Sequence, residues 1–243
     1  MKIACIIPAR YASTRLPGKP LADIAGKPMI QRVYERVAKA QVPTDVIVAT
    51  DDQRVFDAVK AFGGHVVMTS PNHLNGTDRL AEVATAHPDI DVIINVQGDE
   101  PLIEPSLIDE LGNLFVSDDA PVMATVGTEL AEDEYNEPSA VKVIRNRRGD
   151  AMYFSRSLIP YPRNAFVEPP LKHIGIYAYT RDFLLQYANM EPTPAEQTES
   201  LEQLRVLENG YGIRVITTKA RFIGVDTPAD LAAVNEIYKE MNK

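Results

Sequence analysis

The stretch IIPARYASTRLPGKP, residues 6–20, decides the fold that we expect for the whole chain. It begins as the end of an apolar strand over residues 2–7 and breaks at Pro8 into a loop of small residues, cations and stiff prolines. A helix is expected next, from apolar residues at helical spacing: Ile30, Val33, Tyr34 and Val37. A strand that leads into a basic loop and then a helix is how α/β proteins hold phosphates at the carboxyl edge of a parallel sheet.

The charge of this loop differs from that of the chain as a whole. Residues 10–27 carry four cations and a single acid, Asp23, whereas the 243 residues together have a net charge of −9. A local positive cluster on an acidic protein indicates a small anionic ligand rather than a long polyanion. General nucleic-acid binding is not expected, because its electrostatic term needs a basic face.

The composition is that of an ordinary globular protein, with 45% hydrophobic and 24% charged residues. The length suits one core, or one core with a subdomain, and no apolar run approaches a membrane span. The N-terminus lacks the layout of a signal peptide, so we expect a cytoplasmic protein that does not bind membranes. The single cysteine, Cys5, is expected to be a core residue, and the four histidines show no zinc spacing.

Strands and helices alternate through the first half. We expect strands at 2–7, 45–50, 65–68 and 91–97, and helices at 53–62, 78–87 and 105–116. Thr77 is expected to cap the second of these helices. Such alternation predicts a mainly parallel sheet with right-handed crossovers.

The second half predicts a mixed arrangement. Strands are expected at 122–128, 140–144, 151–154, 172–179 and 213–217, with helices at 181–189 and 199–209. A last helix is expected after Thr227 as N-cap, with Pro228 at its first position and Asp230 at its third. The fold prediction is a single α/β domain, residues 1–243, with a mainly parallel mixed central sheet and a smaller second-half subdomain.

The opening loop matches neither of two common nucleotide motifs. No Gly-x-Gly-x-x-Gly follows the first strand, and proline follows both Gly-Lys pairs where a Walker A loop needs Ser or Thr. The loop still offers three potential phosphate contacts, Arg10, Arg15 and Lys19. The alternative is an exposed loop whose cations are merely solvated.

Two carboxylates, Asp99 and Asp226, come directly after apolar runs. If both strands end at the same edge of the sheet, these groups could bind one hard cation such as Mg²⁺, which prefers oxygen ligands. The alternative for each is a helix cap or turn residue. In the second half, the polar residues Arg156, His173, Tyr177, Glu202 and Gln203 are, taken singly, surface or packing residues.

Seven segments together resemble the CMP-Kdo synthetases, the 3-deoxy-manno-octulosonate (Kdo) cytidylyltransferases. They are PARYASTRLPGKPL (8–21), GTDR (76–79), NVQGDEP (95–101), YFSR (153–156), HIGIY (173–177), LEQLR (201–205) and VDTP (225–228). The resemblance implies a nucleotidyltransferase fold of the glycosyltransferase-A type and a homodimer. It also implies the reaction of CTP with Kdo to give CMP-Kdo and diphosphate, which activates Kdo for lipopolysaccharide assembly.

The resemblance also implies roles for individual residues. Arg10, Arg15 and Lys19 would hold the triphosphate, and Asp99 with Asp226 would bind Mg²⁺; Arg10, Lys19 and the two aspartates form the expected catalytic set. Ala9, Asn75, Gly76, Arg79 and Gln97 would lie around the cytidine, and Arg156, His173, Tyr177, Glu202 and Gln203 would bind the sugar acid. Asn75 departs from the serine that relatives often have, so a hydroxyl contact there would be lost.

The mechanism expected from this resemblance is in-line attack of the anomeric hydroxyl on the α-phosphorus. Arg156 is expected to pair with the Kdo carboxylate in a two-pronged contact. The general base is left open between a metal-assisted hydroxyl and His173.

Three other functions are weighed against this one. A cytidylyltransferase for a related acidic sugar, 8-amino-Kdo or a sialic acid, would share most of these segments. A non-catalytic nucleotide-binding regulator would be expected to have lost Lys19 or the carboxylates. A glycosyltransferase that uses a sugar nucleotide would be expected to show Asp-x-Asp, whereas this chain has Asp99-Glu100-Pro101.

Overall fold

The computed structural model describes residues 1–13, 15–73, 75–220 and 222–241. The first half contains β1 (Ile3–Pro8), η1 (Lys19–Leu21), β2 (Asp23–Ile24), β3 (Lys27–Pro28), α1 (Met29–Val37), β4 (Asp45–Thr50), α2 (Gln53–Ala61), β5 (His65–Met68), α3 (Gly76–Ala86), β6 (Val92–Asn95), α4 (Pro105–Asn113) and η2 (Leu114–Val116). The second half contains β7 (Met123–Glu129), η3 (Glu132–Glu134), β8 (Lys142–Arg145), β9 (Ala151–Ser155), β10 (Leu171–Thr180), α5 (Arg181–Ala188), α6 (Pro194–Glu199), α7 (Gln203–Glu208), β11 (Arg214–Thr218) and α8 (Pro228–Met241).

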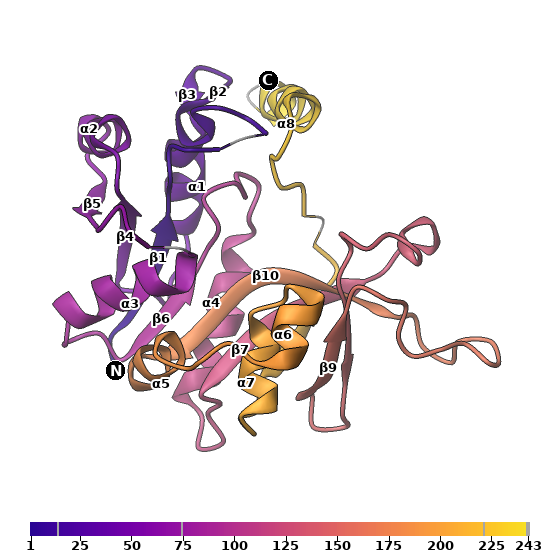
Figure 1. Ribbon diagram of the computed structural model, residues 1–243. Coiled ribbons are helices and arrows are strands. Elements are labelled where there is room, and N and C mark those ends of the chain that lie inside the picture. The colour runs from indigo at the N-terminus through magenta and orange to yellow at the C-terminus, as the bar shows by residue number, and fades with distance from the viewer. Residues whose placement is uncertain (14, 74, 221, 242–243) are drawn as a thin grey trace.

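One mixed sheet runs through the molecule in the order β11-β7-β10-β6-β1-β4-β5, with β8 and β9 branching from β10 (Figure 1). β1 pairs in parallel with both β4 and β6, and β4 in parallel with β5. β10 is antiparallel to β6 and to β7, and so joins the parallel first half to the second half. The prediction of a mainly parallel mixed sheet is therefore confirmed.

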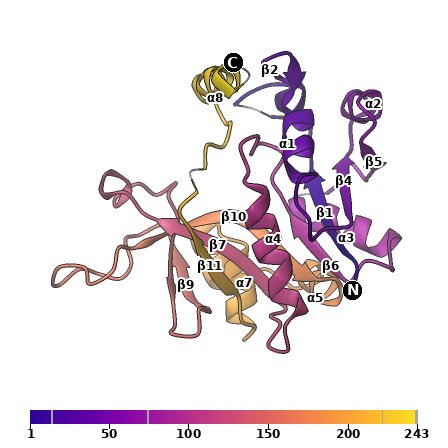
Figure 2. The ribbon, with the colours of Figure 1, turned by 180° about the vertical axis from the view of Figure 1, so that it is seen from behind.

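The two faces of the sheet bury separate cores because alternate residues of a strand point to opposite sides. On β1, Ile3, Cys5 and Ile7 belong to the core that also holds buried residues of α1, α2 and α4, while Ala4 and Ile6 belong to the core with α3, α5 and α7. Figure 2 shows α1 and α4 on the side turned to the viewer. Cys5 is a fully buried core residue, as expected.

Two details of the expected helices are wrong. The helix expected at 199–209 is α7, which begins only at Gln203, because Ser200 adopts a left-handed conformation (φ 52°) that ends a separate short helix, α6, which was not expected. The cap of α3 is Asn75 rather than Thr77: the Asn75 side chain accepts a hydrogen bond from the Asp78 amide at 2.8 Å. By contrast, Thr227 and Asp230 bond each other's main-chain amides at the start of α8, as predicted.

The last helix, α8, lies apart from the sheet, beside the small β2–β3 hairpin (Figure 1). This hairpin was not among the expected elements, since its two-residue strands are too short to produce a sequence pattern. Among the described residues, no helix is both long enough and apolar enough to cross a membrane.

Candidate active site

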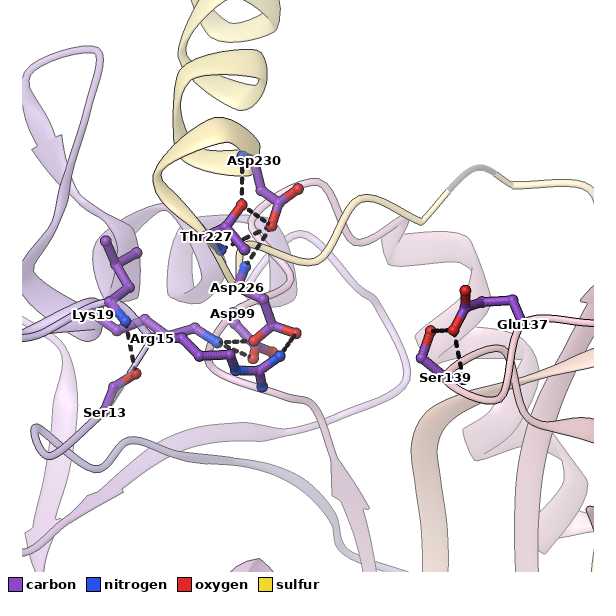
Figure 3. Close-up of polar contacts among 10 residues, drawn as sticks. Ser13, Arg15, Lys19, Asp99, Glu137, Ser139, Asp226, Thr227 and Asp230 are labelled. Carbon is purple, nitrogen blue, oxygen red and sulfur yellow. Dashed lines mark hydrogen bonds and ion pairs between the residues drawn. The ribbon is translucent and has the colours of Figure 1, made fainter. Parts of the chain in front are cut away.

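Four predicted residues meet in one place, which we call the Lys19 cluster: Arg15, Lys19, Asp99 and Asp226 (Figure 3). Lys19 Nζ lies 2.5 Å from Asp99 Oδ2 and 2.8 Å from Asp226 Oδ1. Arg15 donates to the other oxygen of Asp226 at 3.0 Å. The cluster therefore joins the opening loop to the segments that follow β6 and precede α8.

Backbone geometry explains why these segments can approach one another. A Cβ atom at Gly98 would lie 2.8 Å from the Pro8 carbonyl oxygen, so only glycine allows the ends of β1 and β6 to come this close. Beyond it, the Val225 amide donates to the Asp99 carbonyl at 2.9 Å, which holds the two aspartates side by side. The expected convergence of the two aspartates is thus present in the structure, but residues 222–225 before Asp226 are not the strand that was expected.

The charge state of Lys19 follows from competing effects. Its side chain is only 15% exposed, and this burial by itself lowers the pKa of the ammonium group. The nearby charge of Asp99 and the hydrogen bonds that Lys19 donates to both carboxylates outweigh burial and raise the pKa above its usual value. Lys19 is therefore a fixed cation at neutral pH.

The donor set of the cluster is compatible with a magnesium ion. Two carboxylates on adjacent segments supply the hard oxygen ligands that Mg²⁺ prefers, and such sites are usually completed by water and substrate phosphates. The described residues contain no group of three or more Asp, Glu, His or Cys able to hold a metal alone. The two aspartates thus fit an ion that arrives with a phosphorylated substrate.

Glu100 is a further acidic residue at the cluster, and it was not among the predicted site residues. Burial, and then the charge of neighbouring Asp99, raise the pKa of its carboxyl group to about 7. Its Oε2 atom is buried and has no hydrogen-bond partner among the described residues. Its place directly after Asp99 was the available signal, but the sequence could not show which way its side chain points.

Residues expected around the cytidine come from three elements. Ala9 is buried at the end of β1, where its carbonyl accepts from the Thr50 hydroxyl at 2.7 Å, and the next residue, Arg10, is exposed. Gly76 is the first residue of α3 and lies against Pro8. Gln97 donates to the Gly175 carbonyl at 3.1 Å, in the bulge where the β10 pairing with β7 shifts register.

Arg79, also expected near the cytidine, makes its contacts with a different set of residues. Its side chain is completely buried, where it bonds the Thr69 hydroxyl and lies 3.0 Å from Asp51 Oδ2. It thereby ties α3 to the ends of β4 and β5. Its Nε atom is buried without a partner among the described groups. In this structure the Arg79 guanidinium is therefore used for contacts within the protein.

His173 and Tyr177 lie together on β10, with ring centroids 5.4 Å apart. His173 Nε2 is 3.0 Å from the hydroxyl of Thr125 on β7, a residue outside the predicted set. Burial lowers the pKa of His173 to about 3 and raises that of Tyr177. Both groups are therefore neutral at physiological pH.

Glu202 and Gln203 stand at the start of α7. Glu202 Oε2 accepts a hydrogen bond from the Thr77 hydroxyl at 3.1 Å, so this helix is linked to the N-terminus of α3. Burial raises the pKa of Glu202. Gln203 is 3% exposed, and its amide nitrogen has no hydrogen-bond partner among the described groups.

Arg156 is placed differently from the expectation of a fork that binds a carboxylate. Its guanidinium donates to three main-chain carbonyls, those of Glu199 (2.6 Å), Pro138 (3.0 Å) and Ser200 (3.2 Å). These bonds tie the end of β9 to the α6–α7 connection. In this structure the guanidinium is therefore occupied by contacts within the protein.

A groove of about 820 Å³ opens elsewhere, between the segment 160–171 and parts of β8 and β11. None of the predicted site residues lines it.

Comparison with known proteins shows likeness over the full length. A 3-deoxy-manno-octulosonate cytidylyltransferase of Geobacter metallireducens is 57% identical over 248 residues, which cover 97% of each chain. The corresponding protein of Vibrio parahaemolyticus is 53% identical over 98% of each chain. A solved structure of CMP:2-keto-3-deoxy-manno-octonic acid synthetase complexed with CTP is 50% identical, with a TM-score of 0.95 over 99% of this chain and all of that one.

A glucose-1-phosphate thymidylyltransferase structure from Bacillus anthracis, 15% identical with a TM-score of 0.69 over 98% of this chain and 96% of its own, shares the fold. With the mixed sheet and the Lys19 cluster, these likenesses define the class: the chain is a nucleotidyltransferase. The cytidylyltransferase family matches residues 4–218. The chain therefore belongs to the cytidylyltransferase family.

Proposed function

We propose that this enzyme transfers CMP from CTP to the anomeric hydroxyl of Kdo, giving CMP-Kdo and diphosphate. The observation that carries the proposal is the likeness, over almost the whole chain, to a CMP:2-keto-3-deoxy-manno-octonic acid synthetase complexed with CTP. The Lys19 cluster supports it, because cations and paired carboxylates at the edge of the sheet are suited to a bound triphosphate.

In this proposal Arg10, Arg15 and Lys19 neutralise the triphosphate. The anomeric oxygen forms a bond to the α-phosphorus, the bond from phosphorus to the diphosphate oxygen breaks, and the proton of the hydroxyl passes to solvent water. Mg²⁺ held by Asp99 and Asp226 would screen the phosphate charges when bound. Catalysis of such a step is mainly positioning and electrostatic stabilisation, to which the fixed cations of the loop contribute.

The sugar acid is assigned to the side of the molecule that carries His173, Tyr177, Glu202 and Gln203. We assign His173 to sugar binding rather than to proton transfer, because a group with a pKa of about 3 is a weak base at neutral pH. The neutral ring can accept a hydrogen bond from a sugar hydroxyl or donate one to it.

The test is diphosphate release with Mg²⁺, measured with each nucleoside triphosphate and with or without Kdo. We expect release only with CTP and Kdo together. Release with 8-amino-Kdo or a sialic acid, but not with Kdo, would keep the mechanism and replace the substrate. Binding of CTP without release for any sugar would favour the regulatory alternative.

We also propose that the enzyme is a cytoplasmic homodimer whose product serves lipopolysaccharide assembly, as the family resemblance implies. The dimer is supported by exposed apolar side chains on the segment beside the 820 Å³ groove, with Val167 100% and Tyr161 85% exposed. Sedimentation of the wild type and of Val167→Asp tests this. A monomeric wild type would overturn the proposal of a dimer. The cellular role is tested separately, by growth rescue of a cell depleted of its own CMP-Kdo synthetase.

A further inference from the structure

α8 lies where it can influence every part of the Lys19 cluster. It begins two residues after Asp226. It lies beside the β2–β3 hairpin, which starts four residues after Lys19. The loop on its other side carries Pro101, two residues after Asp99. Two side chains of α8, Asn235 and Tyr238, make these contacts.

Asn235 links α8 to the hairpin through both the oxygen and the nitrogen of its side-chain amide. Its Oδ1 accepts from the Ala25 amide at 2.8 Å, and its Nδ2 donates to the Asp23 carbonyl at 3.0 Å. Ala25 has a φ of 49°, a left-handed conformation that costs energy for a residue other than glycine. Arg32 bonds the Ala25 carbonyl at 2.7 Å, so both polar groups of this strained residue are held.

Tyr238 fastens α8 to the loop that follows Asp99. Its side chain is 6% exposed, and its hydroxyl donates to the Pro101 carbonyl at 2.6 Å. The guanidinium of Arg32 lies over the ring, 4.5 Å from its centroid. Arg32 also donates to the Ile24 carbonyl at 2.9 Å, so the same arginine joins the hairpin and α8.

These contacts close a ring of connected segments. The chain runs from Lys19 to the hairpin, crosses to α8 through Asn235, returns along α8 to Asp226, and meets Lys19 again at 2.8 Å. The Tyr238 hydroxyl ties the third member, Asp99, into the same ring. Removal of either link allows the two carboxylates to move relative to Lys19.

We propose that Asn235 and Tyr238 are positioning residues for the transfer step, acting through Lys19, Asp99 and Asp226. This inference rests on the proposed function of the cluster. Misplacement of reacting groups by about 1 Å is enough to lower a rate about 100-fold. The elements assigned to the cytidine, the start of α3 and Gln97, do not contact α8 through hydrogen bonds among the described residues, so binding of CTP is expected to change little.

The kinetic experiment compares wild type with Asn235→Ala, Tyr238→Phe and the double variant. We expect kcat to fall about tenfold in each single variant, with KM for CTP changed less than about twofold. Asn235→Asp keeps the acceptor for the Ala25 amide and is expected to retain more activity than Asn235→Ala. The matched control is Tyr34→Phe, which removes a hydroxyl that accepts from the His65 amide at 3.2 Å and should leave kcat unchanged.

A second readout does not depend on turnover. Hydrogen exchange of the Val225 amide, which bonds the Asp99 carbonyl, is expected to quicken about tenfold or more in both single variants. The Val215 amide, bonded to the Gly149 carbonyl in the second half, should be unaffected. Lower thermal stability with unchanged kcat and unchanged Val225 exchange would overturn the inference. A wild type that makes no product from any sugar would instead overturn the proposed function, while the exchange data still test the positioning role.

Discussion

At the scale of single residues, one ammonium group holds together two carboxylates that would otherwise repel each other. Lys19 occupies the point where Asp99 and Asp226 meet, and Arg15 binds the second oxygen of Asp226. In the substrate complex that we propose, phosphate oxygens and a metal ion would share these same partners. The arrangement therefore keeps the acidic pair assembled before substrate arrives.

We expect Asp226→Asn to lower turnover more than about 100-fold while it weakens CTP binding only a few-fold, because the lost charge would hold the Mg²⁺ that stabilises charge on the transferring phosphate. Steady-state kinetics and calorimetric titration with CTP measure the two effects. Asp182→Asn, at a side chain that is 95% exposed, is the control. Near-wild-type turnover of Asp226→Asn would remove Asp226 from the proposed metal site.

His173 makes the free energy of unfolding depend on pH. Its pKa is about 3 in the folded protein against 6.5 for an unperturbed histidine, so below pH 6.5 the unfolded chain takes up a proton that the folded protein does not. This effect is absent above pH 6.5 and grows as the pH falls toward 3. At pH 5 the loss is about 2 kcal/mol.

His173→Gln should remove that acid-side loss while keeping a hydrogen bond to Thr125 within reach. Urea unfolding at pH 5 and pH 7.5 provides the measurement. An unchanged difference between the two pH values in the variant would show that other groups cause the acid sensitivity.

Sequence and structure agree best where chain position alone decides the chemistry. Asp99 lies beyond the end of β6, as a strand pattern predicts, but the apolar run 222–225 before Asp226 is not a strand. Asp226 reaches Asp99 from the segment before α8, where the Val225 amide donates to the Asp99 carbonyl. Arg79 and Arg156 are placed differently from the ligand-binding roles expected of them, because a guanidinium lies at the end of a long side chain and can turn toward carbonyls or into the core. Residue spacing does not fix the direction of such a side chain. The bonds of Arg156 to main-chain carbonyls therefore could not be predicted from its motif.

At the scale of elements, the start of α3 shows how a cap can be misassigned. Both Asn75 and Thr77 are good capping residues, and the structure selects Asn75 because α3 begins at Gly76, next to Pro8. The Thr77 hydroxyl is then free to bond Glu202 on α7. The hydroxyl thus connects the expected nucleotide and sugar sides.

Asn75→Ala should lower the free energy of unfolding by about 1 kcal/mol, because the Asp78 amide loses its cap. Asn75→Ser, which keeps a capping side chain at this position, should change it by only a few tenths of a kcal/mol. Chemical denaturation of both variants measures the difference. Equal stabilities of the alanine and serine variants would contradict the capping role.

The short elements were the ones that sequence could not predict. Helical spacing marks α1 and α8 well, since each buries an apolar face over two or more turns. The two-residue strands of the β2–β3 hairpin leave no alternation to detect, and the break between α6 and α7 depends on one left-handed residue, Ser200. Yet the hairpin is what α8 docks against.

At the scale of the whole molecule, a cationic loop sits on a chain of net charge −9. The distant acids repel CTP over long range, while the cations of the Lys19 cluster attract it over a few ångströms. Added salt screens the long-range repulsion first, because the screening length falls from about 30 Å at 0.01 M to about 10 Å at 0.1 M.

We therefore expect KM for CTP to pass through a minimum as salt increases. It should fall between about 0.01 M and 0.1 M and rise again toward 1 M, where screening reaches about 3 Å. Kinetics in sodium chloride at fixed Mg²⁺ test this. A steady rise from the lowest salt would show that the net charge of the molecule has no influence on CTP.

The place of β10 in the sheet affects how the nascent chain can fold during its synthesis on the ribosome. β6 is entirely buried, and one of its two neighbours, β10, is synthesised roughly 80 residues later, which takes about 4–16 s at ordinary rates of translation. During that interval the nascent chain presents an unpaired apolar strand edge, a template for misassociation. A nascent chain held before residue 180 would thus remain a client for a chaperone that shields extended apolar segments, until β10 emerges and closes the sheet.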